Sequence, residues 1–302
     1  MKLDKGRVIP IIRSALKEDI GKGDITTGVL IDKFDSANAA IVVNEDCVIC
    51  GMDIAEWTVS QVDYSVRFKP NCKDADEVVA GKEVAFIEGH LGSILRAERT
   101  VLNFLSFLSG IATSTKKFVD IAAPYGVKVM DTRKTLPLLR YLEKYAVFTG
   151  GGSNHRMGLY DQVLIKDNHI KAQSSKLKAQ SGPIKSRIQN SESKYGLKDL
   201  VDKARKGNIK GTVIEIEVTG IEEFKDAISG KPDIIMLDNM TIADVKACVD
   251  IRKAHKAKPL LEVSGGIRFE NIEEYARAKV DMISIGSLTS SVKSIDMSLE
   301  VA

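Results

Sequence analysis

The stretch DTRKTLPLLRYLEKYAVFTGGGSNHRMGLYDQVLIKDNHI, residues 131–170, decides the fold because apolar runs in and before it alternate with polar loops. Three such runs, residues 127–130, 146–148 and 163–165, are each followed at once by polar or glycine residues. Strands that are apolar throughout belong to parallel sheets covered on both faces. Loops at the carboxyl ends of such strands are where α/β proteins place their sites. The stretch therefore predicts buried strands that open into functional loops.

Cationic side chains gather after these three runs. They are Arg133, Lys134, His155, Arg156, Lys166 and His169. A single lysine or arginine after a strand is usually a solvated surface charge, and a single histidine usually has a structural role. Six cationic side chains together at neighbouring strand ends would repel one another without a bound anion. The glycine run 150–152 would let the backbone approach a ligand. The cluster predicts an anion-binding pocket.

Further apolar runs continue the same pattern toward the C-terminus. In all they predict seven buried strands, at residues 127–130, 146–148, 163–165, 213–218, 234–237, 260–263 and 282–285. Helical patterns lie between the later strands, at residues 197–206, 221–229, 242–256 and 272–277. This succession is a right-handed βα repeat. Seven units predict an open α/β barrel one strand short of the eight-stranded form.

The N-terminal part has a different pattern. Strands are predicted at residues 38–43, 47–51, 64–68 and 83–87, and helices at 9–19, 52–61 and 92–110, with another helix from Ser114. Short alternating strands with turn residues between them predict an open antiparallel sheet with helices. Residues 172–193 are rich in Lys, Ser and Gln and are predicted to loop out over the surface.

Acidic residues stand in two of the later strands. Glu215 and Glu217 alternate with apolar residues, so both carboxylates are expected on one side of their strand, toward the barrel interior. Asp238 ends the next strand. Oxygen ligands from neighbouring strands, completed by substrate phosphates, suit Mg²⁺. In the alternative interpretation these acids pair with Arg133, Lys134 or Lys166.

Small residues follow the last two predicted strands. They are Ser264, Gly265 and Gly266 after one strand, and Gly286 and Ser287 after Ile285 of the other. Glycines expose backbone N–H groups, and loops after the last strands of a barrel commonly bind phosphate. A sugar phosphate is the expected occupant.

Composition excludes several other classes of protein. The 302 residues are 44% hydrophobic, enough for a sizeable core. A net charge of +3 and the lack of a basic run interleaved with aromatics argue against nucleic acid as a partner. No apolar run approaches the ~18 residues of a membrane span or forms a signal-peptide core, so a cytoplasmic protein without membrane contact is expected. The four cysteines are expected as buried thiols rather than zinc ligands.

The motifs DTRKT, GGGSNHRMGLYD and LIKDNHI resemble the core motifs of the nicotinate-nucleotide pyrophosphorylase (carboxylating) family, the quinolinate phosphoribosyltransferases. The likeness extends to EDIGKGDITT (18–27), AERTVLNFLSFLSGIAT (97–113), IEIEV (214–218), IIMLDN (234–239), EVSGGI (262–267) and ISIGSLT (283–289). It implies an N-terminal α/β sandwich domain, residues 1–113 joined by the tail 289–302. It also implies an open α/β barrel catalytic domain, residues 114–288.

The resemblance also implies an activity. Quinolinate and 5-phosphoribosyl 1-diphosphate would give nicotinate mononucleotide, CO₂ and diphosphate, in de novo NAD biosynthesis. Arg133, His155, Arg156 and Lys166 would hold the quinolinate carboxylates. Lys134 would assist at a carboxylate or the diphosphate, and Glu217 with Asp238 would organise Mg²⁺ and the ribose. Catalytic roles fall to Lys134, Lys166, Glu217 and Asp238. Further substrate contacts are expected from Thr132, Ser264, Gly265, Gly266, Ile285, Gly286 and Ser287.

Two further expectations concern Arg99 and Ser290. Arg99 lies off the apolar side of its predicted helix, which by itself suggests a surface charge. AERTVLN resembles the family segment whose arginine completes the neighbouring subunit's pocket, which implies a homodimer, or a higher oligomer, with Arg99 acting in trans. Ser290 stands where the family usually has a histidine, so any diphosphate contact made by that histidine is lost or replaced.

Three alternatives stay open at the level of sequence. Lys134 and Lys166, both at strand ends, would also suit a Schiff-base lyase or aldolase. A phosphate-binding module without catalysis would leave Glu217 and Asp238 unexplained. A related phosphoribosyltransferase could act on another base, or on nicotinate itself.

Overall fold

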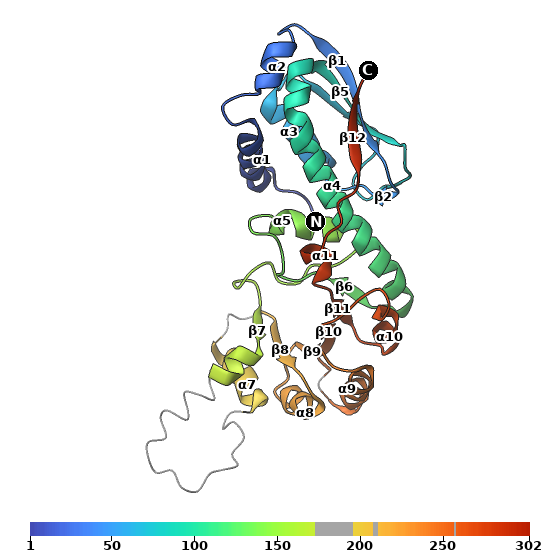
Figure 1. Cartoon of the computed structure of the whole chain (residues 1–302). Helices are drawn as coiled ribbons and strands as arrows, with labels where there is room; N and C mark the ends of the chain where they lie inside the picture. Colours follow the sequence, from blue (N-terminus) through green and yellow to red (C-terminus); the bar gives the residue numbers. More distant parts are fainter. Residues whose placement is uncertain (173–195, 208–210, 257) are drawn as a thin grey trace. The chain divides into compact units, whose positions relative to one another are not determined.

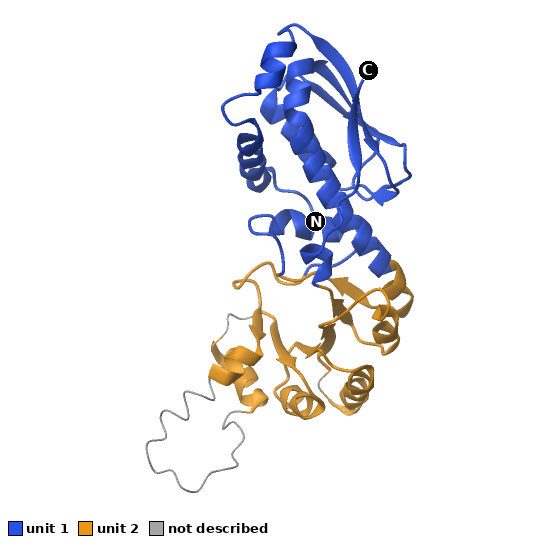
Figure 2. Ribbon diagram, in the orientation of Figure 1, with its two compact units in different colours: residues 1–119, 134–154, 286–302 blue, residues 120–133, 155–285 orange. Residues whose placement is uncertain are grey.

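The structure, a computed structural model, describes residues 1–172, 196–207, 211–256 and 258–302. The chain forms two compact units, distinguished by colour in Figure 2. Unit 1 contains residues 1–119, 134–154 and 286–302, and unit 2 contains residues 120–133 and 155–285. The domain boundaries implied by the resemblance stay a prediction. The surface loop predicted at 172–193 lies, apart from its first residue, outside the described residues.

Unit 1 is built on a four-stranded antiparallel sheet in the order β12-β1-β5-β3. Its strands are β1 (Ser36–Val43), β3 (Arg67–Pro70), β5 (Glu83–His90) and β12 (Met297–Val301), and a separate pair is formed by β2 (Cys47–Val48) and β4 (Glu77–Val78). The C-terminal strand β12 pairs with β1, with Ala39 opposite Val301. The strand predicted at 64–68 begins at Arg67 because the Asp63 carboxylate accepts a hydrogen bond from the backbone N–H of Ser65 and forms a turn.

The helices of unit 1 precede, connect and cover these strands (Figure 1). They are α1 (Lys5–Ile20), α2 (Ile25–Leu30), α3 (Met52–Val62), α4 (Leu91–Ala122, which runs on into unit 2), α5 (Arg140–Thr149) and α11 (Ser287–Ser290). Along α4, Ile94, Val101 and Leu105 recur at helical spacing and are fully buried in one apolar cluster with Ile41 and Ile87 of the sheet. Such spacing puts these side chains on one face of the helix.

The prediction of two helices on either side of Gly110 was wrong, because α4 continues through it. Gly110 was interpreted as the end of a helix, since glycine weakens helix interiors. The structure gives it a packing role instead. A Cβ at this position would overlap the backbone carbonyl of Lys293, so glycine lets the C-terminal segment cross close to the helix.

Unit 2 is built on a six-stranded parallel sheet in the order β6-β11-β10-β9-β8-β7. The strands are β6 (Lys128–Met130), β7 (Val163–Ile165), β8 (Ile214–Val218), β9 (Ile234–Asp238), β10 (Leu260–Ser264) and β11 (Met282–Ser284). Unit 2 also contains the short 3₁₀ helix η1 (Ala123–Tyr125) and the helices α7 (Leu197–Gly207), α8 (Ile221–Ser229), α9 (Ile242–Ala254) and α10 (Ile272–Arg277). From β7 to β11 the strands and these four α-helices alternate along the chain, which confirms the βα alternation predicted for the later strands.

The strand predicted at residues 146–148 was wrong, because these residues lie in helix α5. Three apolar residues are too few to distinguish a strand from a buried helical turn. The sequence from Arg140 to Thr149 contains no glycine or proline, and Leu142 and Ala146 are both buried four positions apart. The helix ends at Gly150, whose N–H donates to the carbonyl of Ala146.

Six described strands therefore replace the seven that were expected. The sheet has β6 at one edge and β7 at the other, and no pairing joins these two edges within the described residues. Closure into a barrel stays a prediction. Among the described residues, no helix has the length and apolar character needed to cross a membrane.

Candidate active site

The six-stranded sheet carries acidic side chains in the middle of its buried strands. In β8, Ile214, Ile216 and Val218 are fully buried, and Glu215 and Glu217 between them are buried as well. The register places Glu217 beside Met236 of β9, and Met236 beside Glu262 of β10. Since alternate residues of a strand share a face, these glutamates lie on the same face of the sheet. The sequence prediction for Glu215 and Glu217 is consistent with this arrangement.

Glu262 was missed by the sequence interpretation, although a signal for it exists. It stands between Leu261 and Val263, just as Glu215 stands between two isoleucines. A charged residue inside an otherwise apolar strand is costly unless it is paired. The alternation that singled out β8 would therefore have found β10 as well.

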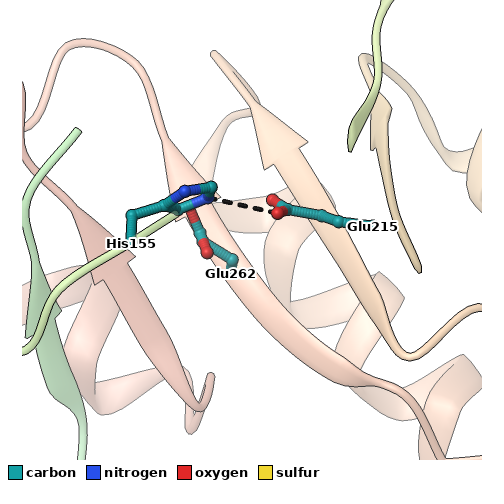
Figure 3. A group of neighbouring side chains, drawn as sticks. All are labelled: His155, Glu215 and Glu262. Atoms are coloured by element: carbon teal, nitrogen blue, oxygen red, sulfur yellow. Dashed lines mark ion pairs between the residues drawn. The ribbon is translucent and has the colours of Figure 1, made fainter. Parts of the chain in front are cut away.

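His155 lies between the carboxylates of Glu215 and Glu262 (Figure 3). Its Nε2 atom is 3.1 Å from Oε2 of Glu215 and 3.6 Å from Oε1 of Glu262. Gln162 donates to the same oxygen of Glu215, and Ser284 donates to Glu262. The backbone N–H of His155 donates to the Asp131 carboxylate at 2.9 Å, and this bond fixes the backbone from which the imidazole extends.

His155, Glu215 and Glu262 could be taken for a metal site, since their ligand atoms lie within 4.8 Å of one another. The imidazole argues against a metal. Its Nδ1 accepts a hydrogen bond of 2.8 Å from the backbone N–H of Arg156, so the ring proton of neutral His155 is on Nε2, toward the carboxylates. A metal-bound histidine normally has the opposite arrangement, in which the second nitrogen donates.

Two arginines meet beside this cluster. Arg156 is only 7% exposed, and its Nη1 donates to the carbonyl of Gln162 at 3.1 Å. Burial lowers the pKa of the Arg156 guanidinium, and the positive charge of the half-buried Arg133 lowers it further. Within the described part of the chain, Nε of Arg156 has no hydrogen-bond partner. A buried arginine beside a second arginine favours a bound anion.

Lys166 follows β7 and forms an ion pair with the Glu217 carboxylate. The lysine side chain is 42% exposed, whereas that of Glu217 is 10% exposed. Lys166 therefore presents its amine at the surface of the unit while Glu217 lies below it. His169, part of the predicted cationic cluster, is exposed, and its Nδ1 accepts from the backbone N–H of Lys166 at 2.9 Å.

Asp238 ends β9 and is half-buried, with Oδ2 accepting from the side-chain amide of Asn239 at 2.7 Å. Asn239 has a left-handed backbone, with φ of 54°. A Cβ on Gly265 would overlap the Asn239 side chain, so this glycine packs against Asn239. Glu217 pairs with Lys166, as the alternative interpretation expected for these acids. Glu217 and Asp238 remain the predicted Mg²⁺ ligands, for an ion whose other ligands come from water and substrate.

The other predicted site residues fall into both units. Thr132, Ser264, Gly266 and Ile285 lie in unit 2, and Arg99, Lys134, Gly286 and Ser287 lie in unit 1. In unit 1, Thr289 donates to the Lys134 carbonyl at 2.7 Å, and a Cβ on Gly286 would lie 3.1 Å from Cδ of Lys134. The side chain of Arg99 is 61% exposed.

The glycine run 150–152 has a packing role in the structure. A Cβ on Gly150 would overlap the Ala112 carbonyl of α4, and one on Gly152 would come within 2.8 Å of Thr115. Packing therefore explains Gly150 and Gly152 without a ligand, and the approach of this run to a ligand stays a prediction.

The fold and the arrangement of side chains together define an α/β protein in which buried carboxylates and a buried arginine lie together in a unit built on a parallel sheet. The family model "Quinolinate phosphoribosyl transferase, C-terminal domain" matches residues 111–300, and the corresponding N-terminal domain matches residues 24–109. The chain belongs to the quinolinate phosphoribosyltransferase family.

Individual relatives agree with this membership. A protein from Methanocaldococcus jannaschii named "Probable nicotinate-nucleotide pyrophosphorylase [carboxylating]" is 38% identical over 303 residues, which cover 98% of each chain. A Bacillus subtilis protein of the same name is 38% identical over 94% of this chain and 90% of its own. The solved structure of the nicotinate-nucleotide pyrophosphorylase from Francisella tularensis has a TM-score of 0.87 at 38% identity, covering 100% of this chain and 98% of that one.

Proposed function

We propose that the protein is a quinolinate phosphoribosyltransferase (decarboxylating). It transfers the phosphoribosyl group of 5-phosphoribosyl 1-diphosphate to quinolinate and yields nicotinate mononucleotide, CO₂ and diphosphate, a step of de novo NAD biosynthesis. The observation that carries the proposal is the buried Arg156 beside Arg133, because two guanidiniums in one place suit a substrate with two carboxylates. Full-length family membership supports it.

In this proposal the cations orient the pyridine ring. Arg133 and Arg156 bind the carboxylates as planar forks, and Lys166 adds a third positive charge beside them. His155 does not supply a full charge while its Nδ1 accepts a hydrogen bond, so it acts through its Nε2–H dipole and holds the loop in place. This differs from the role that the resemblance implies, in which His155 binds a carboxylate directly.

The ribosyl transfer relies on electrostatics more than on a nucleophile. Departure of diphosphate leaves a cationic ribosyl centre, and the pyridine nitrogen attacks it in line. Glu217 and Asp238 come from the neighbouring strands β8 and β9, and their carboxylates would stabilise such a centre. The pyridinium that results withdraws electrons from the bond to the adjacent carboxylate, so CO₂ can leave without a covalent enzyme intermediate.

Mg²⁺ is the proposed cofactor. Glu217 and Asp238 would hold it together with oxygens of the diphosphate and water, and bound Mg²⁺ would neutralise charge on the leaving group. Lys134, next to Gly286 in unit 1, would add a cation for the diphosphate. Ser264, Gly266 and Ser287 would offer N–H and hydroxyl groups to the 5-phosphate, in a barrel whose closure is part of the proposal.

A homodimer completes the proposal, with Arg99 reaching the partner's site. In unit 1 a cavity of about 1180 Å³ includes Arg99 in its lining, together with residues of α1 and residues 137–139. Leu138 in that lining is 90% exposed. Exposed apolar side chains on and after α2 (Ile25, Val29, Leu30 and Phe34) add to the uncovered surface. Exposed apolar patches of this kind mark interaction surfaces, and a second copy would cover them.

The proposed compartment of the protein is the cytoplasm.

Calorimetric titration with quinolinate and with nicotinate tests the substrate assignment. Quinolinate is expected to bind more tightly, because nicotinate lacks the second carboxylate that a pair of arginines would bind. Equal affinity for the two acids would contradict the proposal and favour a phosphoribosyltransferase for another base.

A further inference from the structure

The cluster around Glu262 places two buried carboxylates beside one neutral imidazole. Glu215 and Glu262 are both fully buried, and both lie within 3.6 Å of the same atom, Nε2 of His155. With Nδ1 of His155 accepting from a backbone N–H, the imidazole does not bring a positive charge to balance them. Two buried carboxylates at such range do not both ionise readily, because each opposes the charge of the other.

The groups that face Glu262 determine whether its carboxyl is protonated or ionised. They are Glu215 from β8, His155 and Lys166 from their loops, Ser284 from β11, and the neutral Met236 and Met282 in register on either side. Burial, together with the negative charge of Glu215, raises the pKa of the Glu262 carboxyl to about 7. The Ser284 hydroxyl, which donates to this carboxyl, and the positive charge of Lys166 oppose the rise without cancelling it, and the Nε2–H of His155 acts in the same direction.

The cluster is connected to the arginines. Gln162 donates from its side chain to Glu215 and accepts at its carbonyl from Nη1 of Arg156. The negative charge of Glu215 also acts on Arg156 directly. A change of charge at Glu262 therefore reaches the anion site through Glu215, Gln162 and Arg156.

We propose that Glu262 carries a proton while the anion site is occupied, and that it is a positioning residue whose ionisation weakens the binding of a dicarboxylate there. The ligand class rests on the function proposed above. No bond of the substrate changes at Glu262. Its proton exchanges with solvent, and its loss adds one negative charge to the cluster that Gln162 connects to Arg156.

The test measures quinolinate affinity between pH 6 and pH 8.5 for the parent and three variants. In the parent, affinity should fall roughly fourfold to fifteenfold as the pH rises through about 7, the size expected for one added charge that acts through a partly screened site. Glu262→Gln mimics the protonated carboxyl, so its affinity should stay nearly constant. Ser284→Ala removes a hydrogen bond that favours the carboxylate, so the fall should move to higher pH. Glu274→Gln, which changes an exposed glutamate of α10, is the matched control and should follow the parent.

Proton uptake gives a readout that a purely structural role would not change. Titrations at pH 7.5 in buffers of different ionisation enthalpy should show a fraction of a proton taken up per quinolinate bound by the parent, and close to none by Glu262→Gln. The same profile and uptake in both proteins would overturn the proposal.

A ligand-free measurement separates failure of this inference from failure of the proposed function. Infrared difference spectra between parent and Glu262→Gln should show a protonated carboxyl that disappears near pH 7. If neither the parent nor the variants bind quinolinate but this band titrates near pH 7, the substrate assignment is wrong, whereas the inference that Glu262 is protonated is supported. If the band has already disappeared at about pH 5, as it does for an ordinary glutamate, the inference is wrong whatever the substrate.

Discussion

Arg156 shows how one residue can limit the class of substrate. Its guanidinium is buried although arginine keeps its charge at all ordinary pH values, and Arg133 beside it adds a second positive charge. Burial of charge without compensation costs several kcal/mol, so the arrangement is stable only with negative charge close by. Glu215 and Asp161 supply part of it, and an acidic ligand is expected to supply the rest.

Replacing Arg156 with alanine should weaken quinolinate binding by roughly tenfold to a hundredfold, since a hydrogen bond to a charged group contributes about 1.5 to 3 kcal/mol. Titration calorimetry measures the change, and circular dichroism checks that the fold is kept. Arg67→Ala, on the exposed face of β3, is the control and should bind like the parent. If both variants bind quinolinate equally well, Arg156 does not contact the substrate.

Asp238 offers a test of the proposed magnesium. If Asp238 and Glu217 hold Mg²⁺ against the diphosphate, EDTA should abolish turnover and Asp238→Asn should lower kcat by about a hundredfold, a barrier change of ~2.7 kcal/mol. Asp250→Asn, on the exposed side of α9, should leave kcat unchanged. Full turnover in EDTA would remove metal from the mechanism.

At the scale of elements, α4 needs a glycine at position 110 because the C-terminal segment at Lys293 crosses close to the helix there. Gly110→Ala should lower the free energy of unfolding by about 1 to 3 kcal/mol, because the added Cβ overlaps the Lys293 carbonyl. Gly28→Ala in α2 is the matched control. A Cβ there meets open space, so the change should raise stability slightly, by up to ~1 kcal/mol. Denaturant titration measures both. Equal effects would mean that the C-terminal segment does not cross α4 closely.

The sequence pattern predicted the elements whose apolar period was long or clearly alternating. Helices α8 and α10 begin and end where the pattern placed them, and β7 matches its predicted range. Residues 146–148 could not be assigned correctly, because three apolar residues have no measurable period. Gly110 could not either, because its role depends on residues more than 180 positions later in the chain.

A structural repeat in unit 2 was also invisible to apolar patterning. Arg205 of α7 donates to Asp233 and to the Lys231 carbonyl, and Asp233 accepts from the first N–H of β8. In the same way Arg252 of α9 donates to Asp281 and to the Lys279 carbonyl, and Asp281 accepts from the second N–H of β10. Lys231 and Lys279 both have left-handed backbones, with φ of 56° and 63°. The repeat fixes how each helix returns to the next strand, and so where the strand ends that carry the site lie.

For the candidate site, sequence found the cations and the acids of β8 and β9 but missed the cluster behind them. Arg133 and Lys166 follow apolar strands, Glu217 lies within one, and Arg156 follows an apolar run that is helical in the structure, so all four are conspicuous in the sequence. Gln162 and Ser284 are ordinary polar residues in sequence, and only the packing of β8, β10 and β11 brings them to Glu215 and Glu262. The state of His155 depends on a single backbone contact that residue types do not reveal.

At the scale of the whole molecule, the proposed dimer makes each site depend on two chains. Arg99→Ala and Lys134→Ala homodimers should each be nearly inactive. Subunits mixed and allowed to exchange should recover about one quarter of the parent activity, since half of the randomly formed dimers are mixed and each has one intact site. Assays before and after exchange measure the recovery. No recovery after demonstrated exchange would place Arg99 in its own chain's site or outside the chemistry.

The proposed reaction is tested most directly by its carbon balance. The protein is incubated with Mg²⁺, 5-phosphoribosyl 1-diphosphate and quinolinate that is isotopically labelled in the carboxylate adjacent to the ring nitrogen, and CO₂, diphosphate and nicotinate mononucleotide are quantified. The proposed mechanism predicts the three products in equal amounts and no labelled CO₂ when 5-phosphoribosyl 1-diphosphate is left out. A ribosylated product that keeps the labelled carboxylate, or CO₂ released without 5-phosphoribosyl 1-diphosphate, would contradict it.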